Sequence, residues 1–386
     1  MVVFAGTAAT NACVSTVDFS EGRYHSEDTT PTVQVFYDKQ GDMYPAALIP
    51  SRERLTDNFD HSLSCWYNFQ LCNASNSAIQ SDPEAKKHYE IWQEKQRDEI
   101  TRVVNEVADK LNGSQSRKIV ILIHGYRVSE AQISYSNAKE VLLEGRSMAE
   151  SPVFIEVHWD GRNSPRLPLS ALRAWPFAQK TAPLVGFRMR PLLNELNSRL
   201  NRDGAKAELY VLTHSTGAVV AGALFGNPSQ ALPCLESEKA ANKCGPAYTE
   251  FFDFEQSGSD TNYVPHWPNM SLVMLAAATP AATFAVSHQP DLGFLGSHDS
   301  NLMLSMSARD SALNKYIGVP RFLGYSGLGV SRTELKILED TLEGAKPIRA
   351  NVKILDMTEE LGREHGFTHY MNSSEFSHAL DLLWDR

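Results

Sequence analysis

The chain has 386 residues, of which 42% are hydrophobic and 21% are charged, a composition typical of a globular protein with enough apolar material for a large core. Its formal net charge of -10 argues against nonspecific binding to nucleic acid or to anionic membranes. No apolar run reaches the length of a membrane-spanning helix, because the nearest, residues 272–286, is interrupted by Pro280 and several threonines.

The first residues leave the cellular compartment open. Residues 1–13 lack the positively charged start of a signal peptide, but their small residues resemble the end of one. The sequence therefore allows a cytoplasmic protein, or an exported one with a truncated signal segment. Two locally spaced cysteine pairs, Cys65/Cys72 and Cys234/Cys244, could close small loops by disulfides in an oxidising compartment, with free thiols as the alternative.

The first third of the chain predicts one short strand and one long helix. Residues 33–37 are typical of a strand followed by a turn, and the mixed residues 50–81 are expected to wrap the surface. In residues 84–111 apolar side chains recur at three- and four-residue steps, with Asp82 and Pro83 as a start signal. We assign residues 1–110 to an N-terminal extension and this leading amphipathic helix.

Residues 111–386 alternate strands with helices and form the expected main domain. Its strands are apolar on both faces, which indicates a parallel sheet covered by helices on both sides. The expected strands are residues 118–123, 153–159, 209–212, 271–277, 302–306 and 352–356. Helices are expected at residues 134–148, at 171–200 in two or three pieces broken by Pro176, Pro183 and Pro191, at 333–342, and at the C-terminus behind a cap at Asn372.

Residues 227–268 lose this periodicity. They hold two cysteines, several aromatic residues and many polar ones. We interpret them as an insertion after the preceding helix rather than as a second domain. Such a segment is a natural candidate for a lid or a substrate-facing loop.

The stretch that organises the chain is residues 209–226, LYVLTHSTGAVVAGALFG. An apolar strand is followed by a helix of small residues, and Ser215 stands on the turn between them with Gly217 two positions later. This arrangement is typical of a nucleophile elbow, whose serine hydroxyl stands beside a helix N-terminus. It departs from the usual pattern at Thr213, where a glycine is expected.

Other polar residues stand just past the predicted strand ends, where active groups gather in parallel sheets. They are His124-Gly125-Tyr126, Ser215, Asp310 and His369, and the last three follow the order Ser, Asp, His. An imidazole can take the serine proton, and a carboxylate can fix the tautomer of that imidazole. The backbone N–H groups of Thr216 and Tyr126 are the expected donors of an oxyanion hole.

These features resemble the α/β-hydrolase superfamily, in its serine esterase and lipase-like form. The run SARDSALNKYIGVPRFLG, a D-M-T strand end and a G-F-T-H-Y loop are similar to an uncharacterised bacterial branch, a domain of unknown function. The resemblance covers the chain from about Arg117 to the C-terminus, without the 227–268 insertion. It implies an α/β-hydrolase fold with Asp310 and His369 in the triad positions.

Several other residues compete for these roles. His365 is the alternative base, only four residues before the favoured His369. Asp356 ends the last strand too early to reach a histidine in its own loop comfortably, and Asp299 precedes its strand instead of following it. Two further histidines are given structural or surface roles: His214, beside the serine, and His378, in the last helix.

The predicted function is hydrolysis of a small-molecule or lipid ester through an acyl-enzyme on Ser215, without metal or other cofactor. The sequence leaves two alternatives. One is a hydrolase-fold binding protein that has lost catalysis, and the other uses the same triad for acyl transfer or amide cleavage. The ester, the acyl-chain length and the oligomeric state do not follow from the sequence.

Overall fold

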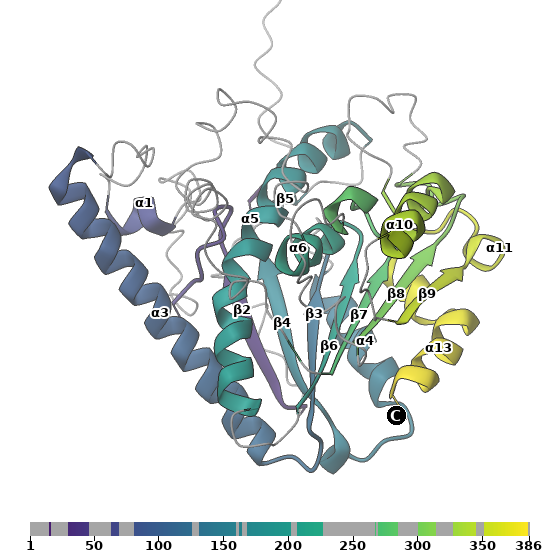
Figure 1. The fold of residues 1–386 in the computed structure, drawn as a ribbon, viewed down its shortest axis with the longest axis horizontal. Coiled ribbons are helices and arrows are strands. Elements are labelled where there is room, and N and C mark those ends of the chain that lie inside the picture. The colour runs from purple at the N-terminus through teal and green to yellow at the C-terminus, as the bar shows by residue number, and fades with distance from the viewer. Residues whose placement is uncertain are drawn as a thin grey trace, which may run out of the picture.

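The computed structural model describes residues 15–16, 30–45, 63–68, 81–125, 131–159, 162–163, 168–201, 207–226, 267, 269–284, 300–313, 327–344 and 351–384. Their main feature is a seven-stranded sheet in the order β2-β4-β3-β6-β7-β8-β9, in which all neighbouring strands are parallel (Figure 1). The strands are β2 (Thr32–Tyr37), β3 (Lys118–Ile123), β4 (Val153–Trp159), β6 (Glu208–His214), β7 (Met270–Leu275), β8 (Ser300–Met306) and β9 (Asn351–Asp356). A separate antiparallel pair joins β1 (Ser15–Thr16) to β5 (Arg162–Asn163).

Helices cover both faces of the sheet. Alternate residues of each strand point to opposite faces, and this divides the buried side chains into two apolar clusters. One cluster includes residues of α3 (Pro83–Asn112), α5 (Pro168–Asn201), α6 (Gly217–Phe225) and α10 (Arg332–Gly344). The other includes residues of α4 (Ala131–Leu143), α12 (Phe367–Met371) and α13 (Ser374–Trp384). The short helical segments are α1 (Leu63–Tyr67), η4 (Met148–Glu150), η7 (Ala281–Phe284) and α11 (Thr358–Leu361). The predicted α/β fold, with a mostly parallel sheet between two layers of helices, is confirmed.

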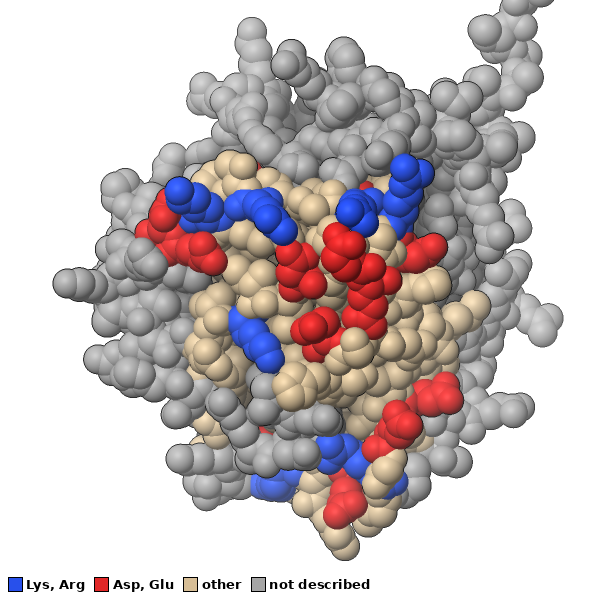
Figure 2. All heavy atoms as spheres, turned by 90° about the vertical axis from the view of Figure 1, so that its right-hand side faces the viewer, with Lys and Arg blue, Asp and Glu red and all other residues tan. Residues whose placement is uncertain are grey.

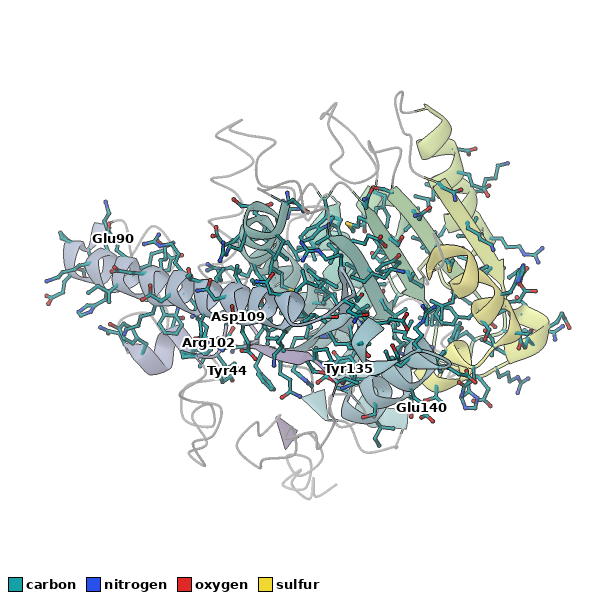
Figure 3. The ribbon with its side chains drawn as sticks, turned by 90° about the horizontal axis from the view of Figure 1, so that it is seen from below. Tyr44, Glu90, Arg102, Asp109, Tyr135 and Glu140 are labelled. Carbon is teal, nitrogen blue, oxygen red and sulfur yellow. The ribbon has the colours of Figure 1, made fainter. Side chains whose placement is uncertain are left out.

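The leading amphipathic helix is also confirmed. The Asp82 carboxylate accepts hydrogen bonds from the N–H groups of Glu84 and Ala85 at the start of α3, and Gly113 follows its end. Figure 3 shows Glu90, Arg102 and Asp109 along this helix. Its apolar face joins β2 in the core cluster that also holds α5 and α6. The sheet and its core therefore span the boundary that the sequence placed at residue 110.

Two local predictions were wrong. Helix α5 runs unbroken from Pro168 to Asn201 although it contains Pro176, Pro183 and Pro191. Pro183 is buried and Pro191 is exposed, and the burial of the helix against the core outweighs the few hydrogen bonds that the prolines remove. At the other end of the chain Asn372 follows α12, and the Ser373 hydroxyl accepts the N–H of Phe376 as the cap of α13.

Some predictions fall outside the described residues. They concern most of the 227–268 insertion, and the side chains of Cys65, Cys72, Cys234 and Cys244. Trp267, at the end of that insertion, is fully buried and its indole N–H donates to the Ala207 carbonyl over 2.7 Å.

None of the helices in the described part of the chain is both long and apolar enough to cross a membrane. Acidic and basic side chains intermingle on the face shown in Figure 2.

A buried ion pair ties α4 to the sheet. The Lys139 ammonium lies 2.8 Å from the Glu156 carboxylate in the middle of β4, and both side chains are about 4% exposed. Gln34 of β2 donates a second hydrogen bond to that carboxylate, and His158 lies beside it. Burial disfavours the ionised form of Glu156, but His158 and Lys139 outweigh it and lower its pKa to about 2. Tyr135, on the same helix, is buried, whereas Glu140 is exposed (Figure 3).

We expect Lys139→Met to lower the free energy of unfolding by about 3–5 kcal/mol, because it leaves a buried carboxylate without its ammonium. The double variant Lys139→Met/Glu156→Gln should be less destabilised. Because the folded pKa of Glu156 lies below its ordinary value of 4.5, its stabilising contribution is complete above pH 4.5 and is lost as the pH falls toward 2. Urea unfolding of the wild type and of Glu156→Gln across this pH range measures the contribution of Glu156 to the free energy of unfolding. An equal pH dependence in both would contradict this assignment.

Candidate active site

The strand order reverses beside β3. From β3 the chain passes through α4 to β4 on one side, and then returns through α5 to β6 on the other. In parallel sheets such a switch point leaves a crevice at the carboxyl ends of the two strands, where ligands bind. His124 and Gly125 follow β3, and Ser215 follows β6. The sheet therefore brings these residues to the same edge.

Ser215 stands on a strained turn between β6 and α6. It adopts a φ of 53°, which is unusual for a residue with a side chain, and it is almost fully buried. A Cβ built on Gly217 would lie 2.5 Å from the Ile123 carbonyl oxygen and 2.7 Å from that of His124. Position 217 therefore requires glycine. The Thr213 side chain is fully buried, and its hydroxyl donates to the Val273 carbonyl oxygen over 3.4 Å.

A single imidazole bridges Ser215 and Asp310. The Nδ1 atom of His365 lies 2.7 Å from Asp310 Oδ2, and its Nε2 atom lies 3.0 Å from Ser215 Oγ. An ionised carboxylate can only accept, so Nδ1 carries the proton and Nε2 accepts the serine O–H. The serine and the imidazole come from segments 150 residues apart.

Asp310 is fully buried and held by four donors. Its Oδ1 atom accepts the backbone N–H groups of Ala312 and Leu313, and the Tyr370 hydroxyl donates to Oδ2 over 2.9 Å. Burial opposes ionisation of this carboxyl, but His365 and these hydrogen bonds hold its pKa below the ordinary value. Burial, followed by the charge of Asp310, raises the pKa of Tyr370, so its hydroxyl stays protonated as a donor.

The structure does not place His369 beside the serine, and this expectation was wrong. His369 is on α12, its side chain is 58% exposed, and its Nε2 atom lies 3.5 Å from a Glu364 carboxylate oxygen. The buried residues of α12 are Phe367, Tyr370 and Met371, which share one side of the helix. Residue 369 therefore points to solvent, while His365 in the preceding turn faces the sheet. This apolar spacing is a signal that the sequence already contained.

The other candidates lie elsewhere or play different roles. Asp356 accepts the N–H and hydroxyl of Thr358 and pairs with Arg332 at 3.0 Å, away from the imidazole. His378 is exposed on α13, as expected. His214 lies against His365, because its Nε2 atom is 2.7 Å from the His365 carbonyl oxygen. Asp299 is outside the described residues.

One of the two residues expected to form an oxyanion hole lies in the described part of the chain. Thr216 is buried directly before the first turn of α6, where backbone N–H groups have no partner within the helix. Tyr126 lies outside the described residues, but its neighbour Gly125 passes so close that a Cβ on it would be 3.1 Å from Ser215 Cβ. Among the described residues, no group of three or more His, Cys, Asp or Glu side chains could hold a metal ion.

No protein-family model and no curated protein matches this chain. Among solved structures it is similar to the apo form of Thermogutta terrifontis esterase 2, with 10% sequence identity and a TM-score of 0.30 over 70% of this chain and 82% of that one. It is also similar to an uncharacterised protein from Bacillus cereus ATCC 10987, with 11% identity and a TM-score of 0.29 over 86% and 83% of the two chains. Such low TM-scores carry no argument about fold or activity.

We expect Gly217→Ala to destabilise the protein by at least about 3 kcal/mol, because the added Cβ would collide with two backbone carbonyl oxygens. Thermal and urea unfolding measure the loss. Gly113→Ala is the matched control, since a Cβ there meets nothing closer than 3.6 Å and the backbone φ is -81°. That control should stay within about 0.5 kcal/mol of the wild type. Equal stability of the two variants would contradict the packing described for the turn.

Proposed function

We propose that this protein is a serine hydrolase of the α/β-hydrolase type that cleaves a carboxylic ester through an acyl-enzyme on Ser215. The observation that carries the proposal is His365, within hydrogen-bond reach of both Ser215 Oγ and Asp310 Oδ2. A catalytically silent relative is expected to show a separated serine and base. The 3.0 Å contact between them favours catalysis instead.

In the first half of the reaction Ser215 Oγ attacks the ester carbonyl carbon while its proton passes to His365 Nε2. Asp310 keeps the other nitrogen protonated and stabilises the imidazolium that forms. The buried carboxylate can do this because its lowered pKa keeps it ionised. As the tetrahedral intermediate collapses, His365 returns the proton to the departing alcohol oxygen.

The negative charge on the former carbonyl oxygen requires donors that are already in place. Thr216 supplies one backbone N–H at the start of α6, where the positive end of the helix also favours an anion. We assign the second to the backbone of Tyr126, the next residue after Gly125, on which a Cβ would lie 3.1 Å from Ser215 Cβ. In the second half, His365 activates a water molecule that hydrolyses the acyl-enzyme, and Ser215 is released.

The first test is labelling with a fluorophosphonate probe, which reacts with an activated serine. We expect the probe to label Ser215 in the wild type and not to label Ser215→Ala. Turnover of short-chain aryl esters should disappear with the same substitution. A wild-type protein that is neither labelled nor active would overturn the proposal.

The two histidines give a sharper comparison. We expect His365→Gln to lower kcat/KM by about a thousand-fold or more, because the serine loses its base. His369→Gln is the matched control four residues away, and its exposed side chain should be replaceable within about twofold. If His369→Gln abolished turnover and His365→Gln did not, the assignment of the base would be reversed.

Tyr370→Phe removes one hydrogen bond from Asp310 and leaves the buried ring in place. The loss raises the pKa of Asp310, so the ionised carboxylate is lost at a higher pH than in the wild type. We expect the acidic side of the kcat/KM profile to move to higher pH, with roughly a tenfold loss of activity at neutral pH. A profile identical to that of the wild type would show that the hydroxyl does not act on the carboxylate.

A further inference from the structure

We propose that His214, the residue before the nucleophile, is a positioning residue that fixes the backbone of the base against the nucleophile turn. This inference rests on the proposed function. It concerns how the imidazole of His365 is kept on the line between Ser215 and Asp310. His214 does not touch the reacting atoms in this assignment.

The alternation of β6 determines where the His214 side chain points. Leu209 and Val211 belong to the core cluster with α6, whereas Tyr210 and Leu212 belong to the cluster with α12. By the same alternation Thr213 turns toward the first cluster and His214 toward the second. The His214 ring accordingly packs against α12, with ring centroids 5.4 Å from Phe367 and 6.1 Å from Tyr370.

The key contact joins a side chain of β6 to the main chain of the base. His214 Nε2 lies 2.7 Å from the His365 carbonyl oxygen. A carbonyl oxygen can only accept, so Nε2 must carry a proton and donate it. This hydrogen bond holds the main chain of His365, whose imidazole has to reach Ser215. Its donor, His214, is the residue directly before that serine.

The charge state of His214 suits this role. Burial and the neighbouring His365 lower the pKa of His214 to about 3, so the ring is neutral near neutral pH and donates as the Nε2–H tautomer. The two imidazole rings are 4.9 Å apart between centroids and tilted by 45°. During acylation His365 becomes an imidazolium, and a neutral neighbour avoids the repulsion that a second positive ring would add.

The turn that carries His365 is also hydrogen-bonded to the segment that bears Asp310. The Ser307 hydroxyl donates to the Gly362 carbonyl over 3.0 Å, and the Ser311 N–H donates to the Arg363 carbonyl over 3.2 Å. These bonds tie the first half of the turn to the segment that bears the carboxylate. The bond from His214 ties its second half to the strand that bears the serine. The imidazole is therefore held between its two partners by contacts to its own backbone.

The test compares His214→Gln with His214→Met. The two side chains have nearly the same shape, but the glutamine amide can donate to the His365 carbonyl and methionine cannot. We expect the methionine variant to lose about 10- to 100-fold in fluorophosphonate labelling rate and in kcat, with KM changed by less than about threefold. The glutamine variant should stay within about threefold of the wild type. Thermal unfolding of both variants checks that they are folded.

A second measurement does not depend on turnover. The proton between His365 Nδ1 and Asp310 should give a downfield NMR signal in the wild type and in His214→Gln, and that signal should weaken or shift in His214→Met. Equal labelling of His214→Met and the wild type, or equal losses in both variants, would overturn the role of the hydrogen bond. If the wild type is not labelled, the proposed function fails, and the NMR comparison still decides whether His214 positions His365.

Discussion

The close approach of α6 to the end of β3 determines where Ser215 stands. Gly217 lies against two carbonyl oxygens of the β3 end, at distances that leave no room for a side chain. This packing lets the chain turn sharply, and Ser215 takes up the turn with a φ of 53°. The last two side chains of β6 point to opposite faces of the sheet, as successive residues of a strand do. Thr213 enters one core, and His214 faces the turn that carries the imidazole.

A second requirement is that a buried carboxylate stays ionised. Asp310 is fully buried, which by itself favours the neutral form. Two backbone N–H groups, the Tyr370 hydroxyl and the His365 ring together outweigh that cost and keep its pKa low. The ionised carboxylate in turn decides the tautomer of the imidazole, and so leaves Nε2 free to accept the serine proton. The geometry of the site and its protonation state thus come from the same contacts.

The sequence revealed the sheet well because its strands are apolar on both faces, a pattern that parallel strands between helices require. It also located Ser215 directly after β6 and Asp310 four residues after β8, since these positions follow from the ends of the strands. The sequence-based prediction failed where the local structure depends on several tertiary contacts together. Helix α5 tolerates three prolines because the surrounding core holds it, and a count of prolines in one segment does not contain that information. The cap of α13 was predicted at Asn372, one residue before the observed cap at Ser373.

The error at His369 has a different origin, because the needed information was present in the sequence. Motif resemblance pointed to the loop that holds His365 and His369, but it could not separate two histidines four residues apart. Phe367, Tyr370 and Met371 define the buried side of α12, and residue 369 lies opposite them. The same reasoning on β6 turns His214 toward the base. Periodicity therefore does more than locate the core: once the core is known, it also determines which polar side chains can reach one another.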